Sequence, residues 1–232
     1  MMKASAIKRR LAVHGFWPKG WPINNGMGPL TKRQIARFQA AHGLTASGKV
    51  GPKTTKALNA PGTRKAPGER ARAVNWAKSR VGIVEHPAGS NQGPKITAWQ
   101  ELSGYPGGGV PWCQCFVNAS AYVGTRKRLK PALIGGYTVS VVNMADRGDH
   151  GLKRISLEAA QPGDWLFFNF PGGESVDHVG LFMSRDGSTV HTIEGNTSAE
   201  GASGSQSNGG GVFRRTRNRS LIAAVVRPPF KN

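Results

Sequence analysis

The sequence predicts an α+β protein, in which a small three-helix domain precedes a larger domain of helices packed on an antiparallel sheet. Apolar residues recur at helical spacing in the first part of the chain, and short β-like runs follow Pro162-Gly163. Helices first and antiparallel strands afterwards are typical of α+β domains. We expect the three-helix domain at residues 1–60, a linker at 61–69 and the second domain at 70–232.

The first domain is predicted from three short amphipathic segments. Ala6–Val13 has helical spacing, and Thr31–His42 has it more clearly, with Thr31 as the expected N-cap. Pro52–Leu58 begins with proline, which suits the first turn of a helix. Three short helices make a complete but small bundle.

The second domain follows the segment APGTRKAPGE, whose Pro-Gly turns and lack of apolar periodicity indicate a linker. Arg70–Val81 and Trp112–Tyr122 are predicted helices, and Ser198–Gly211 is so rich in glycine and polar residues that we expect a flexible loop. The predicted strands are Asp164–Phe170, His178–Met183, Thr189–Glu194 and Leu221–Val226.

The charge points to polyanionic partners. The chain carries 32 Lys and Arg against 12 Asp and Glu, a net charge of +20, and residues 1–60 contain no acidic residue. Such a field attracts nucleic acid, anionic lipid and bacterial wall polymers alike. Basic residues interrupt the start before a signal peptide could form, and no run is long enough to cross a membrane, so we expect synthesis in the cytoplasm without membrane insertion.

The two cysteines, Cys113 and Cys115, are too close in sequence for an unstrained disulfide. Cys113 falls at the first turn of a predicted helix, where free N–H groups and the helix dipole stabilise a thiolate. Cys115 should face another direction and fill space in the core. Free cysteines are more often buried than nucleophilic, and this spacing does not match a zinc site, so we expect no metal.

A cysteine nucleophile needs a base, and the base needs an orienting group. His178 stands where a polar stretch meets an apolar strand, from which an imidazole can reach a helix N-terminus. Glu194 and Asn196 are two residues apart and so share a strand face, and either could accept the second imidazole N–H.

These segments resemble the CHAP family, cysteine- and histidine-dependent amidohydrolases and peptidases with a papain-like fold. PWCQCFV is similar to its Trp-Cys-Ala-x-Phe-Val motif, QPGDWLFF to its Pro-Gly-Asp segment, DHVGLF to its His-Val-Gly strand and IEGN to its Glu-x-Asn end. The resemblance, over about 70–230, implies Cys113 as nucleophile, His178 as general base, and Glu194 and Asn196 as the orienting pair, without a cofactor. Gln114 departs from the small residue common in that motif.

The first sixty residues are similar to three-helix peptidoglycan-binding domains. TKRQIARFQAAHGL and GKVGPKTTKAL carry the resemblance, which implies bacterial peptidoglycan as the ligand, with anionic wall polymers as further partners. The two resemblances together imply a monomeric hydrolase of peptidoglycan amide bonds, either an N-acetylmuramoyl-L-alanine amidase or an endopeptidase.

The layout also resembles bacteriophage endolysins, which implies synthesis in the host cytoplasm, release by a separate pore-forming protein and action at the wall. A bacterial autolysin or an exported toxin would use the same chemistry. A non-catalytic protein that binds walls or nucleic acid is the rival from another class, favoured by the basic runs Lys8–Arg10, Arg126–Lys130 and Arg214–Arg219. No recognised nucleic-acid motif accompanies these runs, so we expect no specific nucleic-acid partner.

Overall fold

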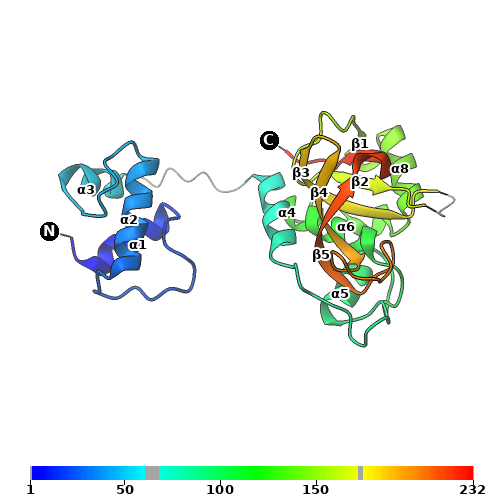
Figure 1. Cartoon of the computed structure of the whole chain (residues 1–232), viewed down its shortest axis with the longest axis horizontal. Coiled ribbons are helices and arrows are strands. Elements are labelled where there is room, and N and C mark those ends of the chain that lie inside the picture. Colours follow the sequence, from blue (N-terminus) through cyan, green and yellow to red (C-terminus); the bar gives the residue numbers. More distant parts are fainter. Residues whose placement is uncertain (1, 61–67, 172–174, 232) are drawn as a thin grey trace. The chain divides into compact units, whose positions relative to one another are not determined.

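The computed structural model describes residues 2–60, 68–171 and 175–231 (Figure 1). The chain divides into two compact units, residues 1–66 and 67–232. Most of the predicted linker, residues 61–67, lies outside the described residues. Over the described part of the chain, no helix has the length and apolar character needed to cross a membrane.

The N-terminal unit consists of α1 (Ala4–Val13), α2 (Pro29–Ala41) and α3 (Pro52–Asn59). Its core contains Ile7, Leu11, Trp17, Ile35, Phe38 and Leu58. The predicted N-cap at Thr31 was wrong, because α2 begins two residues earlier at Pro29, with Gly28 as the cap. Proline has no N–H to leave unpaired, which makes it favourable in the first turn.

Five α-helices belong to the described part of the C-terminal unit: α4 (Glu69–Lys78), α5 (Pro94–Leu102), α6 (Cys113–Gly124), α7 (Pro131–Ile134) and α8 (Thr138–Arg147). Two short 3-10 turns, η1 (Asp149–Gly151) and η2 (Arg219–Leu221), complete the helical elements. The sequence predicted α4 and α6 but not the other three helices. Helix α4 also ends before Val81, which lies outside the helix.

The sheet of this unit has six antiparallel strands in the order β1-β6-β2-β3-β4-β5. They are β1 (Lys153–Arg154), β2 (Trp165–Phe168), β3 (His178–Asp186), β4 (Thr189–Thr197), β5 (Gly211–Asn218) and β6 (Ile222–Arg227). Four of the six strands match predicted runs, whereas β1 and β5 were not predicted. The α+β class predicted from the sequence is therefore the architecture of the chain.

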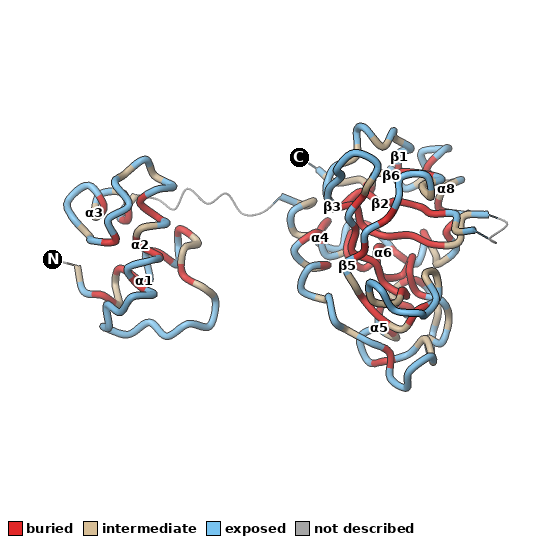
Figure 2. Tube along the Cα trace, in the orientation of Figure 1, coloured by how far each residue is buried: buried red, intermediate tan, exposed pale blue. Residues whose placement is uncertain are grey.

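Both faces of the sheet are covered near β2, which explains why its sequence is continuously apolar. Trp165 and Phe167 belong to the main core together with α6, while Leu166 and Phe168 belong to a second cluster on the opposite face. Helix α6 packs against β3 and β4, and Figure 2 shows its backbone among the buried segments. The start of α6 is therefore held beside the two strands that carry the remaining candidate site residues.

Candidate active site

Cys113 is the first residue of α6, and Trp112 is the N-cap. The indole N–H of Trp112 donates to Oε1 of Glu85 (2.9 Å), and both side chains are buried. This bond fixes the residue that precedes the thiol. Cys113 itself is 4% exposed, so its thiol lies at the helix N-terminus in a site that is almost closed to water.

His178 is the first residue of β3 and is fully buried. Its ring lies 6.2 Å from the ring of Phe168 and 5.8 Å from that of Phe170. The Nε2 atom is 3.0 Å from Oε2 of Glu194. Since Nε2 is occupied, Nδ1 is the ring nitrogen left for Cys113; it has no hydrogen-bond partner among the described residues. Cys113 nevertheless lies close enough to raise the pKa of His178.

Glu194 lies in β4 and is also fully buried. Thr192 donates its hydroxyl to Oε1 of the carboxylate (2.5 Å). Arg217, from β5, grips the same carboxylate with two donors: Nε to Oε1 (3.0 Å) and Nη2 to Oε2 (2.5 Å). A guanidinium that donates two hydrogen bonds to one carboxylate fixes its orientation and stabilises its ionised form. One connected series therefore runs from Arg217 through Glu194 and His178 to the Cys113 thiol.

The shifted pKa values follow from this series. Burial alone would lower the pKa of His178, but hydrogen bonding and negative charge from Cys113 and Glu194 outweigh it and raise the pKa to about 9. Burial would raise the pKa of Glu194, but hydrogen bonds and positive charge from His178 and Arg217 lower it to about 2. At neutral pH the site therefore holds an imidazolium next to a carboxylate.

Two glycines leave the space that the site needs. Gly180 in β3 is paired with Glu194, and a Cβ added to Gly180 would overlap the Glu194 side chain. A Cβ added to Gly195 would lie 2.6 Å from Cζ3 of Trp112 and 2.7 Å from Cβ of Phe116. The glycine of DHVGLF thus makes room for the carboxylate, and the glycine of IEGN lets β4 approach α6.

Comparison with known proteins gives a family match for the N-terminal unit. Residues 3–58 match the family model described as "Putative peptidoglycan binding domain". A solved structure, described as "Crystal structure of a wild type endolysin LysIME-EF1", is similar with a TM-score of 0.42 and 15% sequence identity. That similarity covers 71% of this chain and 66% of the endolysin chain. A search of curated proteins gives no match.

The peptidoglycan-binding match coincides with the three helices of the N-terminal unit, and Gln39 within it holds two of its segments together. Gln39 donates to the carbonyl of Lys49 (2.7 Å) and to the Thr54 hydroxyl (3.0 Å), and accepts from the Gly48 N–H (2.9 Å). These three bonds tie α2 to the turn before α3. The motif therefore specifies this fold more directly than it specifies a ligand contact.

Asn196 differs from the sequence expectation. Its amide donates to the carbonyl of Ser207 (3.4 Å) and to Oδ1 of Asn208 (3.2 Å), and its own Oδ1 has no partner among the described residues. The expected common face with Glu194 fails because the β4–β5 ladder shifts register between residues 194 and 197, and Asn196 has a left-handed φ of 57°. Glu194 is therefore the residue brought to His178.

The segment predicted as a flexible loop, Ser198–Gly211, is tied to the site. Gln206 accepts hydrogen bonds through Oε1 from Arg215 and Arg217, the latter at 2.7 Å, and its carbonyl accepts from the Thr197 hydroxyl (3.0 Å). Sequence reasoning missed Arg217 because it lies in a run that resembles a basic surface patch. Strand alternation in GVFRRTRN was the available signal, since it places Arg215 and Arg217 on one face.

Cys115 and Gln114 are buried on other sides of α6. Burial, its largest influence, raises the pKa of the Cys115 thiol to about 12, as expected for an unreactive core residue. Gln114 donates to Oδ1 of Asn118 (2.9 Å) within the helix, so the departure from the small residue serves a buried polar contact. In the described part of the chain, no group of three or more His, Cys, Asp or Glu side chains could hold a metal ion.

Proposed function

We propose that this chain is a peptidoglycan hydrolase of the CHAP type, in which a cysteine thiolate cleaves an amide bond of the cell wall. The observation that carries the proposal is the buried series in which Arg217 holds Glu194, Glu194 holds His178, and His178 meets Cys113 at a helix N-terminus. The peptidoglycan-binding match over residues 3–58 supplies the substrate class. Glu194 is the orienting residue in this proposal, while Asn196 supports the adjoining loop.

The proposed reaction begins with a thiolate–imidazolium pair. The Cys113 sulfur attacks the amide carbonyl carbon, and the oxyanion forms near the N-terminus of α6, where helix N–H groups and the dipole stabilise negative charge. The C–N bond then breaks as His178 gives its proton to the departing amine, leaving a thioester. Water, deprotonated by His178, hydrolyses the thioester, releases a carboxylic acid and regenerates the thiol.

Glu194 favours this sequence because its carboxylate keeps the imidazole in one orientation and stabilises its protonated form. The closed, apolar surroundings from Phe168 and Phe170 strengthen these charge interactions. A peptidoglycan-binding unit on the same chain raises the effective concentration of the enzyme at an insoluble substrate. The basic residues of that unit add attraction to anionic wall polymers, which salt should weaken.

Mass spectrometry of purified peptidoglycan after digestion tests the proposal. Amide hydrolysis should create one new amine and one new carboxyl group per cut, and the fragment masses separate an amidase from an endopeptidase. Cys113→Ala should abolish cleavage, whereas Cys115→Ala, a matched change two residues along the same helix, should retain it. Cleavage by Cys113→Ala, or new reducing sugar ends in place of amines, would refute the mechanism.

We further propose that the enzyme acts in lysis of a bacterial host, made in the infected cell and released by a separate pore-forming protein. An autolysin or an exported toxin would use the same residues. The genes next to the coding sequence decide among these roles: a neighbouring pore-protein gene supports phage lysis, and a secretion-system cluster contradicts it.

A further inference from the structure

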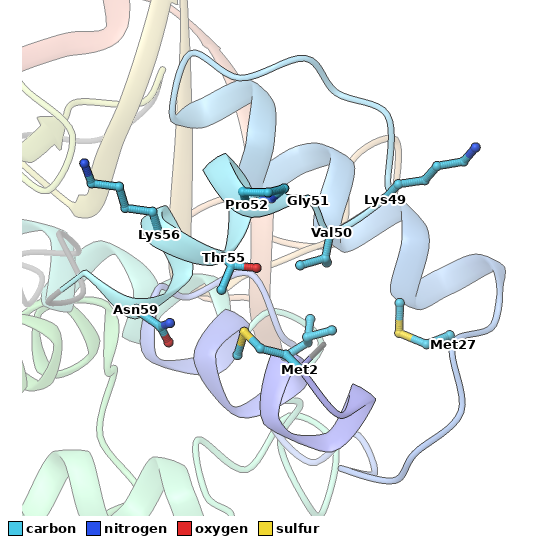
Figure 3. Close-up of a pocket in the computed structure, with 10 residues that line it drawn as sticks. Met2, Met27, Lys49, Val50, Gly51, Pro52, Thr55, Lys56 and Asn59 are labelled. Carbon is cyan, nitrogen blue, oxygen red and sulfur yellow. The ribbon is translucent and has the colours of Figure 1, made fainter.

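The N-terminal unit contains a pocket of about 1030 Å³ beside α3 (Figure 3). Figure 3 shows Met2, Val50 and Thr55 turned toward the same space, with Lys49 and Lys56 at opposite edges of it and their ammonium groups directed outward. Pockets that bind small ligands commonly measure about 300–1,000 Å³ and combine an apolar lining with a few polar groups. This pocket is therefore large enough for a short peptide.

The floor is apolar and adaptable. Met2 and Met27 line it together with Val50 and the buried Ile7. Methionine side chains are flexible and polarizable, so they can close around small aliphatic groups of varied shape. Such a floor suits a ligand with methyl-sized side chains.

The polar groups of the pocket are open to a ligand. Thr55 and Asn59 are four residues apart in α3 and so lie on one face of the helix, facing the pocket. Neither side chain hydrogen-bonds to another described residue. They can therefore donate to, and accept from, the amide groups of a bound peptide backbone.

The charge of the pocket selects an anion. The charged residues that line it are Lys49 and Lys56, and residues 1–60 contain no Asp or Glu to neutralise them. No aromatic ring lines the pocket to offer a flat face to a sugar; Trp17 and Trp21 line a separate hollow of the same unit. The chemistry therefore favours an acidic peptide over a glycan.

We propose that this pocket binds the acidic stem peptide of peptidoglycan, with its alanine methyl groups on the methionine-lined floor and its carboxylates at the rim, beside Lys49 and Lys56. The proposal rests on the proposed function and specifies the ligand of its binding unit. It implies that the enzyme attaches to the peptide part of the polymer, which also contains the amide bonds. Attachment then brings the catalytic unit to sites rich in substrate.

Binding of the N-acetylated stem peptide acetyl-Ala-γ-Glu-Lys-Ala, whose two carboxylates outnumber its one amine, to the full chain tests the proposal, with Cys113→Ala in every variant to prevent cleavage. The double change Lys49→Glu and Lys56→Glu should weaken binding by about tenfold or more, because both attractive charges become repulsive. Lys53→Glu is the matched control, since Lys53 is an exposed residue of α3 outside the lining. It should alter binding by less than about twofold.

An uncharged variant tests the floor independently of charge. Met27→Ala should weaken peptide binding, whereas Val13→Ala, at an exposed apolar residue outside the pocket, should not. Circular dichroism of each variant checks that the helices remain folded.

Three results would overturn the proposal for this pocket. The first is no binding of the stem peptide, and the second is a loss of affinity with Lys53→Glu equal to that of the double variant. The third is binding of peptide-free glycan strands, instead of the peptide, that depends on Lys49 and Lys56. Cleavage of peptidoglycan by the wild-type chain is measured separately. Cleavage without stem-peptide binding overturns only the proposed ligand of the pocket. Stem-peptide binding without Cys113-dependent cleavage overturns the proposed enzyme alone.

Discussion

Replacement of Arg217 by methionine tests whether the buried series behaves as one unit. Methionine keeps much of the side-chain volume but removes the charge and every donor. Arg217 has a side chain that is 5% exposed, and its partner Glu194 is 0% exposed. The change would therefore leave a buried carboxylate without its strongest partner.

The cost can be worked from the contacts. Two charge-assisted hydrogen bonds from Arg217 to Glu194 are lost, each worth about 1.5–3 kcal/mol. Removal of one partner from a buried ion pair typically costs about 3–5 kcal/mol. His178 and Thr192 still hold the carboxylate, so we expect the lower end of that range, about 3 kcal/mol. Arg217→Lys keeps the positive charge but loses the paired N–H donors of the guanidinium, and it should reduce the free energy of unfolding by about half as much as Arg217→Met.

Denaturant unfolding measures this cost as a change in midpoint at constant slope. Arg214→Met is the matched control, because Arg214 is an exposed residue of the same strand, and it should change stability by less than about 0.5 kcal/mol. The N-terminal unit is the same in all variants, so its contribution cancels. The double variant with Glu194→Gln should lose less stability than the two single changes added together.

A second readout separates positioning from stability. Without Arg217 the pKa of Glu194 should rise, but its carboxylate stays ionised in the alkaline range where His178 titrates. Because the positive charge that shares this carboxylate is gone, the imidazolium should be held more strongly, and the alkaline limb of the cleavage profile should move to higher pH. If Arg217→Met were as stable as Arg214→Met and kept the wild-type pH profile, the reasoning about the series would be wrong.

Three further predictions concern the same unit. The raised pKa of His178 means that its contribution to stability is complete below pH 6.5 and lost as the pH rises through about 9. The contribution of Glu194 is complete above pH 4.5 and lost as the pH falls through about 2. The difference in unfolding free energy between wild type and His178→Gln should therefore shrink as the pH rises from 6.5 to about 9, and a constant difference over this range would contradict the prediction. Gly180→Ala should reduce cleavage by about 100-fold by displacing the Glu194 carboxylate, while Gly68→Ala, where an added Cβ meets nothing within 4 Å, should leave the rate unchanged. Asp164→Ala should cost about 3–5 kcal/mol in unfolding experiments because two arginines lose a buried partner, yet its cleavage profile against pH should not move.

Helix α6 and strands β3 and β4 were predictable because local signals and tertiary packing agree there. The turn before Trp112 stops one element, the apolar run after Cys113 begins the next, and His178 opens a strand of strong β-formers. Approach of His178 to Glu194 could be expected from short antiparallel strands. Each of these features depends on residues close in sequence.

The unpredicted helices depend on packing more than on local preference. Helix α5 is short and begins with proline, and it is held by the burial of Ile96 and Trp99 in the main core. Helix α8 contains a run of β-branched residues, whose intrinsic preference favours strands. Its apolar residues Val141 and Ala145 are nevertheless buried. Tertiary contacts outweighed local propensity in both cases.

Strand β5 and the register shift in β4 could not be predicted from the sequence for a different reason. The sequence of β5 looks like a basic surface run, yet Arg215 and Arg217 are buried. Their charges are tolerated because Arg217 bonds to Glu194 and Arg215 bonds to the Ser198 carbonyl and Gln206. The register shift between Glu194 and Thr197 changes the alternation by which strand faces are predicted, and Asn196 bonds to Ser207 and Asn208 instead of His178. Both features follow from partners that are distant in sequence.

These buried arginines also alter the meaning of the net charge. In the run Arg214–Arg219, Arg215 and Arg217 are buried and hydrogen-bonded, and Arg219 faces Glu158 at 3.4 Å. Two of the four arginines in the run are therefore internal and a third faces a carboxylate, which weakens the sequence argument for a nucleic-acid surface at this run. In residues 2–60, by contrast, every Lys and Arg except Lys8 is exposed, without an acidic neighbour in that range. The attraction to polyanions is thus concentrated on the unit that matches a peptidoglycan-binding family, while positive charge in the C-terminal unit serves in part to orient a carboxylate.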